Sequence, residues 1–188
     1  SKIYFGSGED VAAYYPNFGW SVAFKAFDPT TNTWSAVPNA PGSLYKQGFV
    51  LNDMLYCASS LGTMDVFDPS SNSWAQVTTT GSMGQLSSGC SYTIGNKGYA
   101  LSVQQGPSLF EFDPTTNTWT WLQSLPVEFG TAKVVGVGAY GYGCIPGNAS
   151  NFRRYDPATN TWSDLAPIPD AQAAGPLYAV GNKIYARS

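Results

Sequence analysis

The stretch FDPTTNTW at residues 27–34 decides the fold of this chain, because it recurs three more times within 188 residues. The later copies are FDPSSNSW at 67–74, FDPTTNTW at 112–119 and YDPATNTW at 155–162. Their starts lie 40, 45 and 43 residues apart, and self-similarity at such a period is typical of a repeat architecture. A repeat specifies the scaffold, whereas function resides in the segments that differ between repeats.

Each copy has the chemistry of a β-hairpin turn. We expect Phe27 to end one strand and Trp34 to begin the next. Between them, Asp28 can cap the turn through its carboxylate, Pro29 presets its own φ, and Asn32 tolerates the left-handed conformation needed to leave the turn. The phenylalanine and tryptophan are large aromatic anchors, so the sequence predicts that both are mostly buried between neighbouring sheets.

Two further β-rich runs precede the hairpins, and the second run is centred on a tyrosine. These tyrosines are Tyr4, Tyr56, Tyr99, Tyr142 and Tyr185. Turn dipeptides such as Asn52-Asp53 and Gly95-Asn96 separate the two runs. Each unit therefore holds four short strands, here called A to D, and no segment shows a helical period. Four-stranded units of this length are typical of β-propeller blades, which makes the predicted fold class all-β.

In its four hairpins and its strand B tyrosines, the chain resembles the kelch family of β-propellers. The resemblance covers residues 1–188, which we treat as one propeller segment. The chain begins and ends at a strand B, which gives 17 strands, one more than four closed blades need. Because a propeller must close to protect its edges, one interpretation is a segment of a larger ring, about six-bladed as the resemblance implies. The other is a four-bladed ring with one frayed strand.

Composition narrows the range of partners. The net charge is −3 with no basic cluster, so nucleic acid is not expected as a partner. No apolar stretch is long enough to span a membrane. Charged residues make up only 11% of the chain, and this Ser/Thr/Asn/Gly-rich surface resembles secreted or cell-surface kelch arrays of bacteria. That resemblance implies an extracytoplasmic location, namely secreted, periplasmic or at the cell surface.

The absence of histidine removes imidazole general bases, Ser-His-Asp triads and most imidazole metal sites. The three cysteines lie in strands of different units and lack paired spacing, so we interpret them as small buried hydrophobes. The recurring aspartates occupy one turn position and are interpreted as caps. We therefore expect no catalytic residues, no metal and no cofactor, and we prefer a non-enzymatic role while leaving an enzyme open.

Function should lie where the repeats disagree, and the first unit carries about ten extra residues between strands B and C. This insert, GSGEDVAAYYPNFGWS at 6–21, contains Tyr14, Tyr15, Phe18 and Trp20. Aromatic residues in a loop, where strand packing does not require them, make a candidate binding surface. The alternative is that the insert folds back over the ring and buries them.

The connections from strand D to the next strand A should share a face with this insert. Their residues nearest strand A include Tyr45, Gln85, Glu128 and Gln172, which we expect to ring the mouth of the central channel. This mostly neutral, polar rim suits hydroxyl-rich or amide-rich ligands.

We therefore expect a non-catalytic binding module for a glycan or a protein partner, either on its own or as part of a larger polypeptide or complex. The alternative is a sugar-modifying kelch enzyme such as a sialic acid mutarotase-like epimerase, for which Glu128 with Arg153 or Arg154 would supply the charged groups. A third hypothesis, a cytoplasmic substrate adaptor, is the least favoured.

Overall fold

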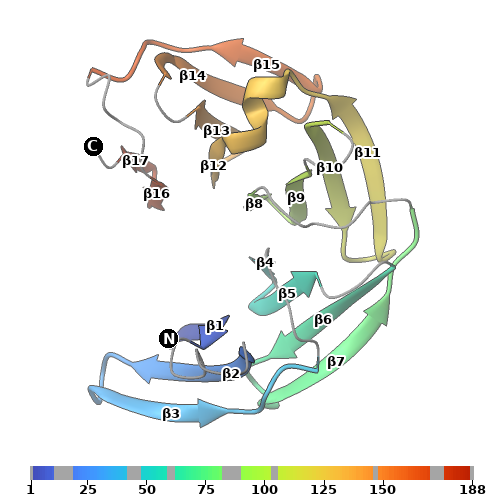
Figure 1. The fold of residues 1–188 in the computed structure, drawn as a ribbon, viewed down its shortest axis with the longest axis vertical. Coiled ribbons are helices and arrows are strands. Elements are labelled where there is room, and N and C mark those ends of the chain that lie inside the picture. The colour runs from blue at the N-terminus through green and yellow to red at the C-terminus, as the bar shows by residue number, and fades with distance from the viewer. Residues whose placement is uncertain are drawn as a thin grey trace.

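The computed structural model describes residues 2–10, 19–41, 48–58, 62–81, 90–102, 106–145, 148–169 and 176–186. Within these ranges there are seventeen strands and one short 3-10 helix, and the strands form five antiparallel sheets. The sheets follow one another in chain order around an open arc, with both termini on the same side of it (Figure 1). The all-β prediction is confirmed, and the arrangement is that of a β-propeller segment.

Each sheet consists of consecutive strands in sequence order. The first sheet contains β1 (Ile3–Asp10), β2 (Gly19–Asp28) and β3 (Thr33–Val37). The second contains β4 (Gly48–Leu51), β5 (Met54–Ala58), β6 (Thr63–Asp68) and β7 (Ser73–Thr78). The third contains β8 (Ser91–Ile94), β9 (Lys97–Ser102), β10 (Ser108–Asp113) and β11 (Thr118–Ser124). The fourth contains β12 (Lys133–Val137), β13 (Tyr140–Ile145), β14 (Asn148–Asp156) and β15 (Thr161–Asp164). The fifth contains β16 (Leu177–Val180) and β17 (Lys183–Ala186).

The arc differs from the four-bladed ring with a frayed strand. Closing four blades would require β16 to pair with β1, the strand B of the first sheet. Among the described residues, β16 pairs with β17, and β1 pairs with β2. The 3-10 helix, η2 (Val127–Thr131), was also not expected from the sequence, which shows no helical period.

The hairpin turns have the predicted chemistry. Asp28 Oδ1 accepts a hydrogen bond from the backbone N–H of Thr30 at 2.9 Å, and Asp113 Oδ1 accepts one from Thr115 at 2.8 Å. The turn asparagines all adopt the left-handed conformation, with φ between 51° and 54°: Asn32, Asn72, Asn117 and Asn160. Asparagine is one of the few residues that adopt this conformation at low cost, which explains why all four copies of the phrase place it there.

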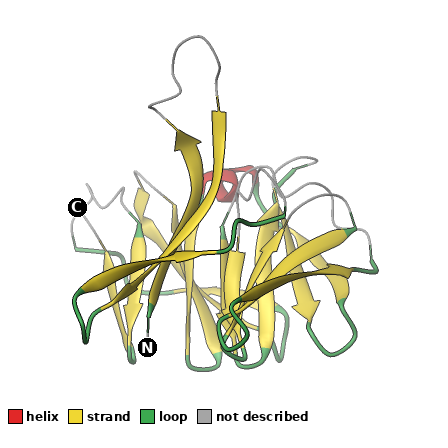
Figure 2. Cartoon of the chain, turned by 90° about the horizontal axis from the view of Figure 1, so that it is seen from below, coloured by secondary structure: helices red, strands yellow, loops and turns green. Residues whose placement is uncertain are grey.

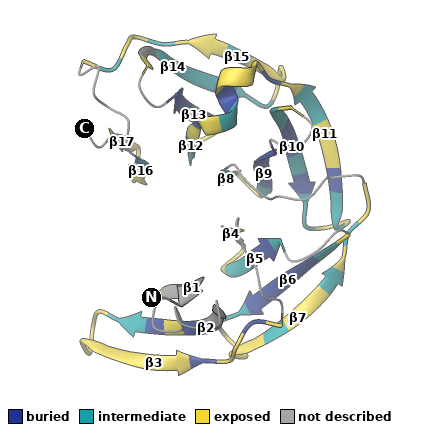
Figure 3. Ribbon diagram, viewed as in Figure 1, coloured by how far each residue is buried: buried dark blue, intermediate teal, exposed yellow. Residues whose placement is uncertain are grey.

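The core lies between successive sheets. Phe112 of the third hairpin packs its ring against Tyr56 of the second sheet at 5.7 Å, and Trp119 packs on Phe49 at 6.1 Å. Phe112 is 0% exposed and Trp119 4%. Figure 3 shows this burial concentrated in the middle sheets, whereas most of β3 is exposed. The aromatic anchors therefore join one blade to the blade before it.

The prediction that every hairpin tryptophan is mostly buried is wrong for Trp34, which is 56% exposed. Trp74 packs on Phe24 of the first sheet at 5.0 Å, so a hairpin tryptophan is covered by the sheet that precedes it. Within the described chain, no sheet precedes the first one. Trp34 packs on Phe27 of its own hairpin instead, at 5.0 Å.

The innermost strands approach each other closely where the fourth sheet meets the third. A Cβ atom at Gly136 of β12 would overlap the carbonyl oxygen of Thr93 in β8. Figure 1 shows β4, β8, β12 and β16 nearest the centre of the arc. Glycine at 136 is therefore required by the spacing between neighbouring inner strands.

Replacing Trp119 by alanine should lower the free energy of unfolding by about 3–5 kcal/mol, because the change leaves a cavity between two sheets. Replacing Trp34 by alanine should cost less than half as much, because more than half of that side chain is already exposed. Urea unfolding of both variants tests this contrast. Equal losses of unfolding free energy would show that cover by a preceding sheet does not determine how much each tryptophan stabilises the fold.

The hairpin carboxylates should contribute stability that acid removes. A hydrogen bond from Lys97, and then those from Thr115, hold the pKa of Asp113 well below its ordinary value of 3.8. A depressed pKa stabilises the fold above the unfolded value, and this contribution is lost as the pH falls through the folded value. We expect Asp113→Asn to melt below wild type at pH 7, with a gap that narrows steadily below about pH 4. A gap independent of pH would contradict the assignment.

Candidate functional site

The β1–β2 hairpin is the most distinctive feature of the first sheet. Its strands are among the longest in the described chain, with eight and ten residues. The two ends of the predicted insert loop, residues 6–10 and 19–21, are thus strand, and Glu9 pairs with Trp20 and Asp10 with Gly19. Figure 2 shows this hairpin projecting beyond the body of the sheets, on the side that also carries the 3-10 helix.

Most of the predicted binding residues lie outside the described residues. They are Tyr14, Tyr15, Phe18, Tyr45, Gln85 and Gln172. Trp20 lies in β2 near the far end of the projecting hairpin, where it pairs with Glu9. The residues 11–18 connect the two strands beyond this pair. The grouping of the predicted residues into one surface therefore remains a prediction.

Glu128 lies on the 3-10 helix η2 and is exposed. The neighbouring Phe129 is buried and meets the ring of Trp162 edge-on at 5.2 Å. Phe129 also donates its backbone N–H to the carbonyl of Pro126 at 2.9 Å. Because Phe129 packs the helix against the fourth sheet, the backbone at Glu128 is held in place while its side chain is exposed to solvent.

The two arginines proposed as partners for Glu128 interact elsewhere. Arg153 donates from Nε to Asp164 Oδ1 at 2.7 Å and lies 5.4 Å from the centre of the Phe129 ring. Arg154, its neighbour in β14, lies 4.5 Å from the centre of the Tyr140 ring. Consecutive strand residues point to opposite faces, so one carboxylate cannot engage both arginines. Among the described residues, Glu128 forms no ion pair with either.

A buried carboxylate in the second sheet was missed by sequence reasoning. Asp65 of β6 is 0% exposed and accepts a hydrogen bond from Gln76 Nε2 at 3.1 Å. It pairs across strands with the buried Cys57. The available signal was an acidic residue two positions before the hairpin phenylalanine, where the third unit has Phe110.

A second set of charges stabilises the third hairpin. Lys97 lies 2.6 Å from Asp113 and 3.6 Å from Glu111. Glu111 Oε2 in turn accepts a hydrogen bond from the hydroxyl of Tyr99 at 2.7 Å. Burial and this bond raise the pKa of Tyr99. Each of these side chains interacts with another of the set, so together they connect β9, β10 and the hairpin turn and have a structural role.

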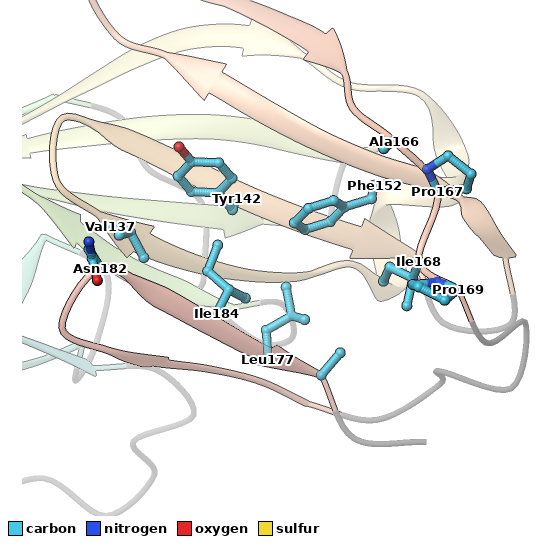
Figure 4. A pocket seen from close by; sticks show the side chains of 11 residues that line it. Val137, Tyr142, Phe152, Ala166, Pro167, Ile168, Pro169, Leu177, Asn182 and Ile184 are labelled. Carbon is cyan, nitrogen blue, oxygen red and sulfur yellow. The ribbon is translucent and has the colours of Figure 1, made fainter.

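A cavity of about 570 Å³ separates the fourth and fifth sheets and was not foreseen from the sequence. Tyr142 and Phe152 of the fourth sheet lie opposite Leu177 and Ile184 of the fifth (Figure 4). The remaining lining residues come from the end of β12, the β16–β17 turn, the connection after β15 and the end of β17: Val137, Asn182, Ala166, Pro167, Ile168, Pro169 and Ala186. The cavity is predominantly apolar.

The described residues contain no group of three or more histidine, cysteine or acidic side chains that could hold a metal ion. In the same residues, no helix is long and apolar enough to cross a membrane. The cysteines are free thiols, of which Cys57 and Cys144 are buried and Cys90 is partly buried.

The sequence matches no protein-family profile and no curated protein. Among solved structures, the chain is similar to YjhT, with a TM-score of 0.66 and 18% sequence identity. The match covers 93% of this chain and 65% of the YjhT chain, so the chain spans just under two thirds of that structure. At this identity the likeness shows the fold alone, and it is compatible with a kelch-type β-propeller.

The native thiols should resist aromatic disulfide reagents. Burial raises the pKa of Cys57 to about 12 and that of Cys90 to about 11. At pH 8 only roughly one Cys57 side chain in ten thousand is then a thiolate, the reactive form. We expect negligible thiol release from native protein and three equivalents in denaturant. Rapid native release of one equivalent would identify a reactive cysteine.

Proposed function

We propose that this chain is a non-catalytic binding module that recognises a glycan or a protein partner through the loop-bearing face of the propeller. The observation that carries the proposal is the projecting β1–β2 hairpin (Figure 2). It leads into an aromatic-rich segment, 11–18, that has no counterpart in the other units. Because those units form complete sheets without such a segment, the scaffold does not require it.

The residues assigned to this surface have the chemistry of a recognition site. Tyrosine and tryptophan provide a large contact area and are enriched among the residues that dominate interface energies. Tyr14, Tyr15, Phe18 and Trp20 supply this area, and the amides of Gln85 and Gln172 supply hydrogen bonds. Together they favour a hydroxyl-rich or amide-rich partner.

We place the chain among kelch propellers of the secreted or cell-surface type, so the binding module would act outside the cytoplasm. The hairpin phrase and the strand B tyrosines support the family, and the low fraction of charged residues supports the location. The fold shared with YjhT is compatible with this placement.

The alternative is a sugar-modifying kelch enzyme, such as a sialic acid mutarotase-like epimerase. The likeness to YjhT supports it as much as the binding module, because it rests on the fold. The exposed Glu128, held in place by Phe129, is the group available for acid–base work. The binding module is preferred because, among the described residues, Glu128 forms no ion pair with Arg153 or Arg154, and Arg153 already pairs with Asp164.

Replacing Trp20 by alanine should weaken partner binding by about 2 kcal/mol or more, as for an interface anchor, without changing the melting temperature. Binding can be measured on a glycan array and by pull-down of proteins from the extracytoplasmic fraction of the source. Trp121→Ala is the matched control, because Trp121 is 56% exposed on an outer strand away from this hairpin. If Trp20→Ala lowers stability and leaves binding intact, the insert belongs to the fold.

Magnetisation-transfer NMR separates the enzyme from the binding module. The experiment measures the exchange between the anomers of free sialic acid with and without the protein. Exchange that is accelerated by wild type and restored to the spontaneous rate by Glu128→Gln would favour the epimerase. A bound glycan whose anomers exchange at the spontaneous rate would favour the module.

A further inference from the structure

The projecting β1–β2 hairpin leaves the first sheet through a β-bulge. Between the pairs Gly6–Phe24 and Gly8–Ser21, β1 has a single residue and β2 has two. The bulge therefore consists of Ser7, Val22 and Ala23. The pairing of β3 with β2 also stops at Phe24, so the hairpin loses its third strand at the same level. Because a bulge leaves the backbone N–H of its extra residue without a partner in the ladder, the direction of the hairpin depends on what holds this bulge.

A buried carboxylate faces this part of the first sheet. Asp65 lies two residues from Phe67 in β6, so both side chains point to the same side of the second sheet. Phe67 is 1% exposed and belongs to the cluster that joins the second sheet to Phe24 and Ala26 of the first. Asp65 is 0% exposed, so its carboxylate lies inside the same junction.

The repeat aligns Asp65 with the base of the hairpin. At the next two junctions the hairpin aromatic of strand C packs on the strand B tyrosine of the preceding sheet, as Phe112 does on Tyr56 at 5.7 Å. The same offset aligns Phe67 with position 4 of β1. Two residues towards the B–C end of each strand, it aligns Asp65 with Gly6, the residue directly before the bulge. Glycine at that position leaves the backbone of β1 open to a close approach.

Packing alone does not require a carboxylate at this position. The equivalent residue of the third sheet is Phe110, which is 7% exposed and part of an apolar cluster. Burial of a carboxylate is costly unless hydrogen bonds stabilise it. Gln76 Nε2 donates one such bond to Asp65 Oδ1 at 3.1 Å, and a carboxylate can accept several. The acid therefore suits a junction in which the first sheet also offers a donor, as the bulge does.

We propose that Asp65 is a positioning residue for the projecting hairpin. Its carboxylate accepts a hydrogen bond from a backbone N–H of the bulge and so fixes the direction in which β1 and β2 leave the body of the sheets (Figure 2). The importance of that direction rests on the function proposed for the hairpin, whereas the contact itself does not. Asp65 acts through the hairpin backbone and touches no ligand.

Hydrogen–deuterium exchange of the intact chain, measured by mass spectrometry, tests this contact without any partner. In wild type we expect protection of the hairpin amides, which are those of residues 6–10 and 19–23. Asp65→Asn keeps the size of the side chain but removes its charge and one acceptor oxygen, and it should speed their exchange about threefold. Asp65→Leu removes both acceptors and should speed it about tenfold. The amides of β9 and β10, in the third sheet, should exchange as in wild type.

Gln76→Leu is the matched control, because it removes the bond that Asp65 receives within its own sheet and leaves the carboxylate in place. The hairpin amides of this variant should exchange within about twofold of the wild-type rate. If Gln76→Leu speeds their exchange as much as Asp65→Leu does, Asp65 acts only through the second sheet and the proposal fails.

Two further results would overturn the proposal. The first is exchange of the hairpin amides at the unprotected rate in wild type, since no contact then holds the hairpin. The second is faster exchange in β5, β6 and β7 of the Asp65 variants while the hairpin amides are unchanged. Failure to find a glycan or protein partner would contradict the function proposed above and leave this contact standing, because no partner enters the exchange measurement.

Discussion

The rest of the structure depends on one contact, in which the aromatic residue that opens the third or fourth hairpin packs against the strand B tyrosine of the sheet before it. The tyrosine is itself stacked on an aromatic of strand A, as Tyr56 is on Phe49 at 5.8 Å and Tyr99 is on Tyr92 at 5.5 Å. The junction between the second and third sheets and the junction between the third and fourth therefore use the same three-ring arrangement. A chain built in this way is held together by neighbour-to-neighbour interfaces, as in other repeat proteins.

This contact also explains which parts of the chain are free to vary. The hairpin turns must keep aspartate and asparagine because the turn sets the register that brings the aromatic residue to the tyrosine. The connections between strands B and C lie at the other end of the strands. The connections from D to A lie there too, and one of them adds the buried Leu125 and Phe129 to the junction between the third and fourth sheets. The first unit can therefore lengthen its B–C connection into a projecting hairpin without changing the turn end of its strands. The turn end of each unit is therefore constrained in sequence, whereas the length of the connection at the other end can vary.

The sequence predicted the parts of the fold that depend on local chemistry. The four hairpins, their caps, the left-handed asparagines and the five strand B tyrosines follow from residue types at fixed offsets. What it could not predict depends on the neighbouring sheet: the exposure of Trp34, the burial of Asp65 and the cavity beside Tyr142. Of the candidate site, the sequence identified the aromatic insert. The predicted loop at 6–21 was too long, because β1 continues to Asp10 and β2 begins at Gly19. Composition alone does not distinguish a long loop from an extended hairpin.

The same contact accounts for the exposure of the aromatic residues in the fifth sheet. Tyr178 and Tyr185 pair across β16 and β17 in the position of Phe49 and Tyr56, so they prepare the same aromatic shelf. Phe49 and Tyr56 are 5% and 8% exposed, whereas Tyr178 and Tyr185 are 54% and 53% exposed. Since the residue types are equivalent, the difference comes from the neighbour and not from the sheet itself. Each sheet thus carries one half of a junction, and how far its aromatic pair is buried depends on the sheet beside it.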